Sequence, residues 1–336
     1  MATAVSIVMT VKNDARGCAQ TLESLLAQTR PAAEILVVDG GSTDNTIETI
    51  GQFAAEHPAV RFLDAPGANI AQGRNVGIAA AAHEVVALTD AGCRAAEDWL
   101  AGLVEPFEGD PAVEFVGGFY RIAPDSLLEE VVGLATMRGQ LDPVDAATFN
   151  PSARSMALTK SAWRKAGGFP EWLRFSEDTL FDERMRRLEV GYRFVPEAVV
   201  HWRPRTSLRS IGKQFYDYGT GRGHTQIDAR SFAYNLRNVA VVAALIAIGF
   251  LVPVVWALAA TAVVYFYVWT FHGKALRIAR RTRRVAAYPL SFVVLWTVLV
   301  ANLIGYLVGS WQRIRCRGTI PMQMDEYLAG TSPAIS

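Results

Sequence analysis

The chain has 336 residues, of which 51% are hydrophobic and only 19% are charged, and its formal net charge is +1 at pH 7. This low share of charge excludes an intrinsically disordered chain and an acidic or basic tail protein. The three cysteines are widely separated and follow no C-x-x-C spacing, which argues against a disulfide framework and a zinc site. A large folded domain with additional apolar segments remains.

The first third of the chain alternates short apolar runs with amphipathic stretches. Four strands are predicted, at VSIVMTV (residues 5–11), EILVVD (34–39), VRFLDA (60–65) and EVVALTDA (84–91). A helix is predicted between each strand and the next. Apolar strands without two-residue alternation indicate a parallel sheet covered on both faces, so the predicted fold class is an open α/β sheet. Ligands bind such sheets at the carboxyl ends of the strands. The candidate binding residues are therefore the polar ones at those ends: residues 12–14, residues 39–44 and Asp90.

Six segments together carry a family resemblance: SIVMTVKND, ILVVDGGSTDNT, AQGRNVGIAAA, ALTDAGC, GGFPEWLRFSEDTLFDERMRRLEVGYRF and VVHWRPR. The order and spacing of these segments across residues 4–225 resemble those of glycosyltransferase family 2. The resemblance implies a GT-A fold, an open mixed sheet with helices on both faces, and transfer of a sugar from a nucleotide sugar with inversion. With the segment QFYDYGTGRG and its C-terminal apolar runs, the chain is similar to bacterial transferases of the succinoglycan type, which build exopolysaccharide or lipid-linked oligosaccharides.

The resemblance assigns the strand-end residues to the sugar donor. It implies that Asp39 contacts the nucleobase and that Lys12, Asn13 and Asp44 border the nucleotide. Arg74, in the segment QGRN, is expected beside the phosphates, because a guanidinium offers a bidentate fork to phosphate oxygens. The alternative for Arg74 is a cation on a helix surface.

The D-x-D motif, which holds a divalent cation in this family, reads Asp90-Ala91-Gly92 here and lacks its second carboxylate. One carboxylate and two phosphate oxygens are enough for Mg²⁺, which keeps several waters, so Asp90 is expected to hold Mg²⁺ or Mn²⁺. His201 is the expected second ligand, since related folds place a late metal-binding histidine there and an imidazole suits Mn²⁺. The alternative is a structural histidine beside Trp202.

The segment Ser176-Glu177-Asp178 precedes an amphipathic helical stretch. Asp178, with Glu177 beside it, is the predicted general base, because an acceptor hydroxyl must lose its proton as it attacks the anomeric carbon. One base is sufficient, since the departing diphosphate needs neutralisation of its charge and no proton. The alternative is a pair of acids that merely favours the start of the helix.

A basic and aromatic segment, residues 201–228, is expected to lie at a membrane surface and to contact a polyprenyl-linked acceptor. Simple anchoring on anionic lipid is the alternative reading of this segment. The resemblance also places the segment NPSAR at the acceptor cleft. The predicted acceptor and lipid contacts are Arg154, Arg203, Arg205, Gln214 and Arg222.

Two uncharged runs, residues 239–271 and 285–309, exceed the length needed to span a bilayer. No Asp or Glu occurs in residues 229–324, while six basic residues lie in residues 273–284, so this loop is expected to be cytoplasmic. Nucleic-acid binding is not expected, because apolar runs interrupt the basic stretch. Three crossings are predicted, near 235–252, 254–272 and 285–309. Two crossings and a re-entrant hairpin are the alternatives.

The predicted organisation is a cytoplasmic catalytic domain (residues 1–228), a multi-pass inner-membrane region (229–312) and a C-terminal tail (313–336). No signal peptide is recognisable at the N-terminus, as expected for a cytoplasmic domain. The predicted function is inverting transfer of a sugar from a nucleoside-diphosphate sugar, a UDP-hexose, to a lipid-linked or polysaccharide acceptor at the membrane. Two alternatives are a polyprenyl-phosphate sugar synthase and a catalytically inactive membrane scaffold that binds nucleotide.

Overall fold

The computed structural model describes residues 3–146, 149–316 and 320–330, and the chain divides into two compact units. A sheet unit comprises residues 1–123, 144–203 and 322–336, and a helical unit comprises residues 124–143 and 204–321. This division differs from the predicted boundary at residue 228. Residues 124–143 leave the sheet unit in the middle of its sequence, and the C-terminal segment returns to it.

The described strands of the sheet unit form one eight-stranded mixed sheet in the order β3-β2-β1-β4-β7-β6-β8-β5. They are β1 (Val5–Val11), β2 (Glu34–Asp39), β3 (Val60–Asp64), β4 (Val85–Asp90), β5 (Cys93–Ala95), β6 (Phe115–Ile122), β7 (Met156–Thr159) and β8 (Tyr192–Trp202). The four strands predicted from sequence, β1 to β4, pair in parallel, and so do β6 and β8. Strand β7 is antiparallel to β4 and β6, and β5 is antiparallel to β8. The predicted open, mixed α/β sheet is confirmed.

The register of the parallel strands decides where the polar strand ends lie. Val11 at the end of β1 is opposite Asp39 of β2, and Thr10 is opposite Asp90 of β4. Both acids therefore lie at the same edge of the sheet, on either side of β1. The strands themselves are almost entirely buried, which is why their sequences are apolar without alternation.

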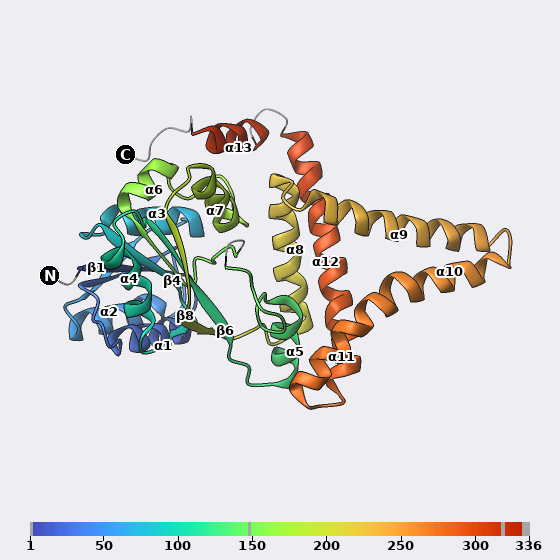
Figure 1. The fold of residues 1–336 in the computed structure, drawn as a ribbon, viewed down its shortest axis with the longest axis horizontal. Helices are drawn as coiled ribbons and strands as arrows, with labels where there is room; N and C mark the ends of the chain where they lie inside the picture. The colour runs from blue at the N-terminus through green and yellow to red at the C-terminus, as the bar shows by residue number, and fades with distance from the viewer. Residues whose placement is uncertain (1–2, 147–148, 317–319, 331–336) are drawn as a thin grey trace. The chain divides into compact units, whose positions relative to one another are not determined.

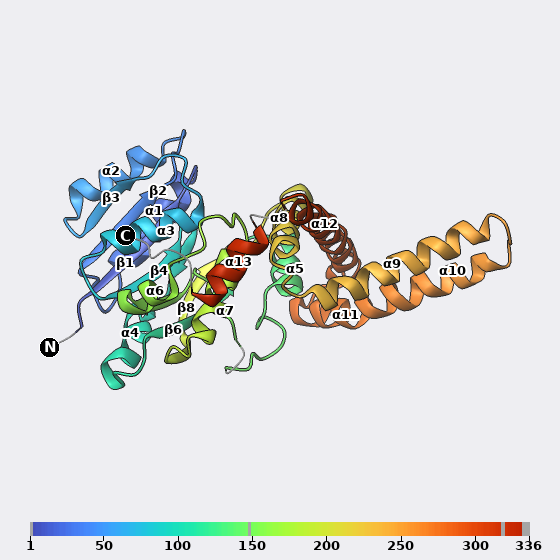
Figure 2. The same ribbon diagram turned by 90° about the horizontal axis from the view of Figure 1, so that it is seen from above.

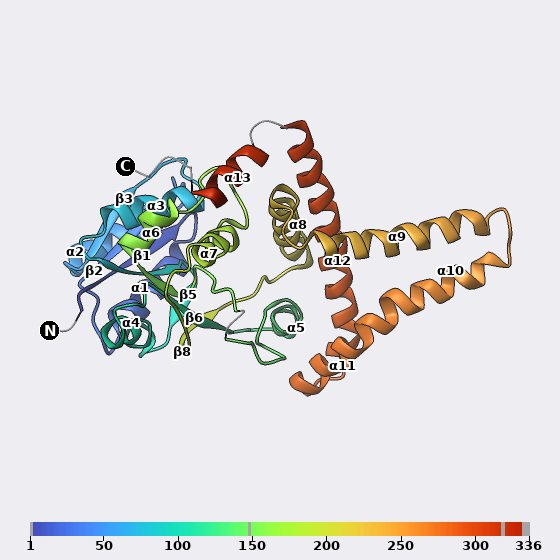
Figure 3. The same ribbon diagram turned by 45° about the horizontal axis from the view of Figure 1, so that its top comes forward.

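Helices cover both faces of the sheet (Figures 1 and 3), with α3, α6 and α7 on one face and α1, α2 and α4 on the other. This arrangement follows from right-handed crossovers, because β1, β2 and β3 advance in one direction and β4 lies on the opposite side of β1. The helices of this unit are α1 (Ala15–Leu26), α2 (Thr46–Glu56), α3 (Ile70–Ala80), α4 (Trp99–Gly109), α6 (Lys160–Ala166), α7 (Glu177–Arg187) and most of α13 (Ile320–Ala329).

The core between the sheet and the α3, α6 and α7 layer is built from large side chains. The ring of Phe169 stacks on that of Phe181 with 4.2 Å between centroids, and Trp163 is buried beside them. Burying an aromatic side chain of this size contributes about 2–3 kcal/mol. This core fixes α7 against the sheet and so determines where the start of α7 lies.

The helical unit contains α5 (Leu127–Thr136), α8 (Leu208–Thr225), α9 (Ala229–Gly249), α10 (Val255–Val263), a π-helical turn (Val264–Trp269), α11 (Thr270–Thr282) and α12 (Ala287–Arg315). Helices α9 and α10 form a long hairpin (Figure 2), which turns across Pro253. By length and composition, two described helices can span a membrane, α9 and α12. A third candidate is the helix pair Val255–Phe266 and Phe271–Thr282, which is bent by 42°.

Helices α8 and α12 pack with their backbones in close contact. A Cβ atom at Gly219 of α8 would lie 2.3 Å from the carbonyl oxygen of Asn302, and one at Gly305 of α12 would lie 2.1 Å from the carbonyl oxygen of Tyr216. Only glycine permits this approach, as in membrane helix pairs with small residues at the interface. Hydrogen bonds near the ends of the helices, including His224 to Gln312 at 2.7 Å, extend the contact.

Candidate active site

The loops after β1 and β2 are tied together by hydrogen bonds. Asn13, in the left-handed conformation (φ 53°), donates its backbone N–H to Oγ of Ser42 at 2.7 Å and accepts from the N–H of Thr43 at 2.7 Å. The ammonium of Lys12 donates to the carbonyl of Gly40 at 2.9 Å. Lys12 and Asn13 are exposed, so these two predicted nucleotide contacts remain available to a ligand.

Asp39 holds together the loop that follows β2. Its carboxylate accepts from the backbone N–H groups of Gly41 and Ser42 at 2.8 and 2.7 Å and from the Ser42 hydroxyl, and its exposure is 0%. The carboxylate has no exposed surface in this structure, and its predicted contact with the nucleobase remains a prediction. Asp39 folds the loop that carries the neighbouring exposed residues.

Asp44 is exposed at the start of α2 and accepts from both the hydroxyl and the backbone N–H of Thr46. The hydroxyl hydrogen bond is the largest of the effects that lower the pKa of Asp44. The carboxylate is therefore ionised at neutral pH and bordered by the Asn13 loop.

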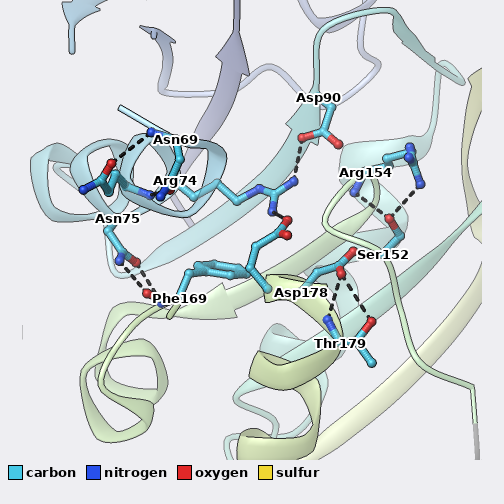
Figure 4. A network of polar contacts seen from close by, with 11 residues as sticks. Asn69, Arg74, Asn75, Asp90, Ser152, Arg154, Phe169, Asp178 and Thr179 are labelled. Atoms are coloured by element: carbon cyan, nitrogen blue, oxygen red, sulfur yellow. Dashed lines mark hydrogen bonds and ion pairs between the residues drawn. The ribbon is translucent and has the colours of Figure 1, made fainter. Parts of the chain in front are cut away.

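Arg74 lies at the centre of the site (Figure 4). From α3, its Nη2 donates to Oδ1 of Asp90 at 2.9 Å and its Nη1 donates to Oε1 of Glu177 at 2.7 Å. The guanidinium also lies over the ring of Phe169, 5.4 Å from its centroid. The side chain is 3% exposed and both terminal nitrogens donate to carboxylates, so the predicted phosphate contact, which these ion pairs do not include, remains a prediction. Arg74 joins the end of β4 to the start of α7.

The charges of this buried cluster are unevenly distributed. Burial disfavours ionisation of Asp90, but the charges of Arg74 and then Arg154 outweigh it and lower the pKa of Asp90. Burial and the charge of Asp178 raise the pKa of Glu177 to about 7, although Arg74 acts in the opposite direction. The Arg74 guanidinium is therefore paired mainly with an ionised Asp90, while Glu177 keeps its proton to a higher pH than an ordinary glutamate.

Asn75 was not predicted as a site residue, although it stands beside Arg74 in the segment QGRN. Its amide accepts from the N–H of Phe169 at 2.8 Å and donates to the carbonyl of Phe169 at 2.8 Å. Gly167 and Gly168 precede Phe169 with φ of 78° and 72°, a left-handed turn that L side chains rarely adopt. Asn75 therefore fixes the segment that leads to α7.

Helix α7 begins at Glu177, and Asp178 occupies its first turn. Oδ1 of Asp178 accepts from the backbone N–H of Thr179 at 2.8 Å, and the side chain is half-buried. Figure 4 shows Asp178 on the same side of the cluster as Arg154. The predicted base thus lies beside the Asp90–Arg74–Glu177 cluster and keeps partial access to solvent.

Arg154 lies near enough to Asp90 for its charge to act on that carboxylate. Its Nη1 donates to Oγ of Ser152 at 3.1 Å, its guanidinium lies 5.1 Å from the centroid of Trp202, and its charge lowers the pKa of Asp90. A half-buried cation near Asp90 is well placed to stabilise negative charge that develops there. Sequence reasoning had assigned Arg154 to the acceptor.

His201 is not supported as a metal ligand. In β8 it pairs with Arg94 of β5 and Arg121 of β6, and burial and then these two cations lower its pKa. Two neighbouring positive charges oppose binding of a third cation. Among the described residues, no three His, Cys, Asp or Glu side chains form a group that can hold a metal ion. Asp90, with its lowered pKa, supplies one hard oxygen donor, which fits a cation bound mainly by substrate phosphates.

The remaining predicted acceptor residues belong to different units. Arg203 is exposed at the end of the sheet unit, and Arg205 is exposed in the helical unit. On α8, the amide of Gln214 donates to the hydroxyl of Tyr218 at 2.9 Å, and Nε of Arg222 lies 3.9 Å from a carboxylate oxygen of Asp228. Their acceptor role remains a prediction.

Residues 6–151 match the family model described as glycosyl transferase family 2. The chain is 30% identical over 225 residues to pre-mycofactocin glycosyltransferase of Mycobacterium tuberculosis, covering 63% of this chain and 46% of that protein. It is 26% identical to the succinoglycan biosynthesis protein ExoA of Rhizobium meliloti, covering 70% of this chain and 76% of that protein. The chain spans less than half of several curated relatives, and only 25% of the Escherichia coli glycosyltransferase YibD.

Solved structures show the same fold. The mannosyltransferase PcManGT of Pyrobaculum calidifontis, in complex with GDP-Man and Mn²⁺, aligns with a TM-score of 0.57 at 20% identity over 93% of this chain and 88% of that chain. GalNAc-T7 with UDP, GalNAc and Mn²⁺ aligns with a TM-score of 0.51 at 15% identity over 66% of this chain and 48% of that chain. The chain therefore carries a glycosyl transferase family 2 domain with a GT-A fold.

Proposed function

We propose that this protein is an inverting glycosyltransferase that transfers a sugar from a nucleoside-diphosphate sugar, a UDP-hexose, to a lipid-linked or polysaccharide acceptor at the membrane. The observation that carries the proposal is the buried link from Asp90 through Arg74 to Glu177, which sets the half-buried Asp178 beside Asp90. Asp90 and Arg74 lie in the part of the chain that matches the family 2 model. The relatives named above support the same class of reaction.

The donor nucleotide is proposed to lie along the ends of β1 and β2. Lys12 and Asn13 are exposed there, next to the loop that Asp39 folds. Lys12 supplies a positive charge for phosphate, and the amide of Asn13 supplies hydrogen-bonding groups for the ribose or the base. Asp44 borders the same loop, where its carboxylate can accept from ribose hydroxyls.

A divalent cation, Mg²⁺ or Mn²⁺, is proposed to be held by Asp90 together with the diphosphate of the donor. When bound, such a cation neutralises the charge of the departing nucleoside diphosphate. Arg154 adds a fixed positive charge near Asp90 for the same purpose. Arg74 keeps the Asp90 carboxylate ionised and oriented.

Asp178 is proposed to accept the proton of the attacking acceptor hydroxyl. Its position in the first turn of α7 orients the carboxylate, and its partial exposure leaves room for an acceptor. Glu177 is held by Arg74 and fixes the start of α7, so it acts as a positioning residue. A single base is sufficient for an inverting transfer, because the diphosphate leaves without a proton.

The membrane context of the proposal rests on the helical unit. The apolar α9 and α12 and the basic α11 favour an inner-membrane protein whose sheet unit is cytoplasmic, where nucleotide sugars are made. In this setting the acceptor is a polyprenyl-linked sugar or a growing polysaccharide. Arg203, Arg205, Gln214 and Arg222 remain the proposed contacts to it.

The function is tested with the purified full-length chain in lipid nanodiscs. It is incubated with a panel of UDP-, GDP- and dTDP-sugars, with Mg²⁺ or Mn²⁺, and with polyprenyl-diphosphate-linked sugars as acceptors, while nucleoside diphosphate release is measured. We expect release with one donor class that depends on Asp90 and Asp178. Nucleotide binding without any release across the panel would instead favour the inactive scaffold.

A further inference from the structure

Helix α12, the longer of the two described helices that can span a membrane, is followed by a segment that belongs to the sheet unit. In α13, the hydroxyl of Tyr327 donates to the carbonyl of Gly168 at 2.6 Å. The carbonyl of Leu328 accepts from Nη1 of Arg184 at 2.8 Å, and the Tyr327 and Leu328 side chains are both buried. The chain after α12 is therefore on the same side of the membrane as the sheet unit.

A chain that leaves and rejoins one domain on the same side of a bilayer crosses that bilayer an even number of times. Helices α9 and α10 pack side by side as a hairpin (Figures 1 and 2), so this hairpin contributes no crossing or two. A crossing by α12 would make the total odd and would put α13 on the wrong side. The parity of the chain path thus argues against a crossing by α12.

The two faces of α12 agree with this conclusion. One face carries Gly305 and packs tightly on α8. The other face presents a continuous apolar stripe, with its members three or four residues apart: Val293, Trp296, Val300, Ile304, Leu307 and Trp311. An apolar stripe on one side of a helix that is covered on the other suits a helix lying in the plane of a membrane surface.

Helix α8 gives an independent reason. The two helices run side by side over most of the length of α8. At one end Gly212 of α8 lies near Thr297 of α12, and at the other end His224 of α8 is hydrogen-bonded to Gln312 of α12. Along this length α8 carries the exposed ion pair of Lys213 and Asp217, 2.6 Å apart. If α12 crossed the bilayer, this charged pair would be carried into hydrocarbon, where ionised side chains are strongly disfavoured.

The basic residues around α12 provide a third argument. Arg283 and Arg284 precede the helix, and Arg313 and Arg315 end it. Because flanking Lys and Arg favour the cytoplasmic side, a spanning helix is expected to show an excess at one end only. Basic residues at both ends instead suit a helix whose two ends meet the same anionic headgroups.

We propose that α12 lies in the plane of the membrane surface, with its apolar stripe among the acyl chains of the leaflet that faces the sheet unit and with α8 on its opposite side. The ligand of this surface is phospholipid, with anionic headgroups at both helix ends. The proposal differs from the prediction of three crossings in the third one, at residues 285–309, and the experiment below decides between them. The proposal concerns membrane attachment and does not depend on the proposed transfer reaction.

The two ends of α12 can be labelled separately in the full-length protein. Cys316 is exposed at its C-terminal end, whereas Cys18 and Cys93 are buried. Val285, 89% exposed, lies just before the helix, so Val285→Cys is made in a Cys316→Ser background. Glu56→Cys in the same background reports the side of the sheet unit. Each protein is treated with a membrane-impermeant maleimide, in spheroplasts and in inverted inner-membrane vesicles.

We expect the maleimide to label positions 56, 285 and 316 in the same preparation. The extent of labelling there should be at least tenfold higher than in the other preparation. Labelling of positions 285 and 316 in opposite preparations would show that α12 crosses, and the proposal would be wrong. Labelling with the same maleimide after detergent solubilisation shows that each cysteine is reactive in the folded protein.

A depth measurement decides the matter if headgroups shield the helix ends. Val293→Cys, Val300→Cys and Leu307→Cys each receive a bimane fluorophore, and the proteins are placed in phosphatidylethanolamine and phosphatidylglycerol vesicles with brominated acyl chains. An in-plane helix places all three at one depth, so the same bromine position quenches them equally. A spanning helix would place positions 293 and 307 about 10 Å to either side of position 300, and unequal quenching would overturn the proposal.

Discussion

Nη1 of Arg74 lies 2.7 Å from Oε1 of Glu177, and both side chains are buried. The two residues are 103 positions apart in the sequence, so this contact exists only because α3 and α7 pack on the same face of the sheet. The same guanidinium holds Asp90 at 2.9 Å. The end of β4 and the start of the helix that carries Asp178 are thus joined through one cation.

Removing this cation should strongly destabilise the sheet unit. Arg74→Met leaves the Asp90 carboxylate without its charged partner in a buried setting, and we expect a loss of about 3 kcal/mol in the free energy of unfolding. Thermal denaturation of the detergent-solubilised protein measures the effect. Arg187→Met on α7 is the control, because its exposed pair with Glu183 contributes at most about 0.5 kcal/mol. Equal losses in the two variants would contradict the structural role of Arg74.

Asp178→Asn should lower kcat about 100-fold and leave the affinity for the donor nucleotide unchanged. Asparagine retains an Oδ1 atom for the Thr179 N–H, so the helix start is preserved and only the basic group is lost. Glu183→Gln on the same helix is the matched control and should keep its activity. If Asp178→Asn remains active with a polyprenyl phosphate acceptor, a polyprenyl-phosphate sugar synthase is favoured, since a phosphate acceptor needs no base.

Binding of Mn²⁺ should require the nucleotide. The proposed site has one carboxylate, and among the described residues no three Asp, Glu, His or Cys side chains form a group that can hold a metal ion. The protein by itself therefore supplies too few ligands for Mn²⁺. Electron paramagnetic resonance of free Mn²⁺ should therefore show weak binding to the protein alone and at least tenfold tighter binding with a nucleoside diphosphate. Asp90→Asn should remove that gain, whereas Asp64→Asn, at the end of β3, should not. Tight binding without nucleotide would contradict the assignment.

Glu177 should make the stability depend on pH. Its folded pKa of about 7 lies above the ordinary value of 4.5, so between these values the folded protein holds a proton that the unfolded chain has released. Raising the pH through this window therefore favours unfolding, and stability should fall from pH 5 to pH 7.5. Glu177→Gln removes this titration and should show a smaller fall in Tm over the same range. An equal fall in both proteins would show that Glu177 keeps an ordinary pKa.

Tyr327→Phe should loosen the turn that leads to α7. The variant leaves the buried Gly168 carbonyl without its donor, which is expected to cost about 1–3 kcal/mol. Hydrogen exchange of the backbone amides of residues 167–178 should become faster. Tyr234→Phe, at an exposed position on α9, serves as the control and should leave exchange in this segment unchanged. Unchanged exchange in Tyr327→Phe would show that α13 does not hold this turn.

Much of the sheet could be predicted from sequence because its determinants are local. The bounds of β1 and β2 follow from short, buried, β-branched runs, and the polar residues that end them lie at one sheet edge because parallel strands share a direction. A helix next to Glu177 and Asp178 was also predicted, and α7 includes both acids in its first turn, where they stabilise it. Each of these features depends on residues within a few positions of one another.

The partners of the charged side chains could not be predicted, because they come from contacts between distant segments. Residue type marked Asp39 and Arg74 as polar and near a ligand, but only packing showed that Asp39 is enclosed by its own loop and that Arg74 is taken by two carboxylates. Asn75 gave no signal beyond its place next to Arg74. Hydropathy likewise marked α12 as apolar without showing that α13 returns to Gly168. Local pattern thus determined the elements, while burial and long-range pairing, which no short window contains, decided which side chains remain available for chemistry.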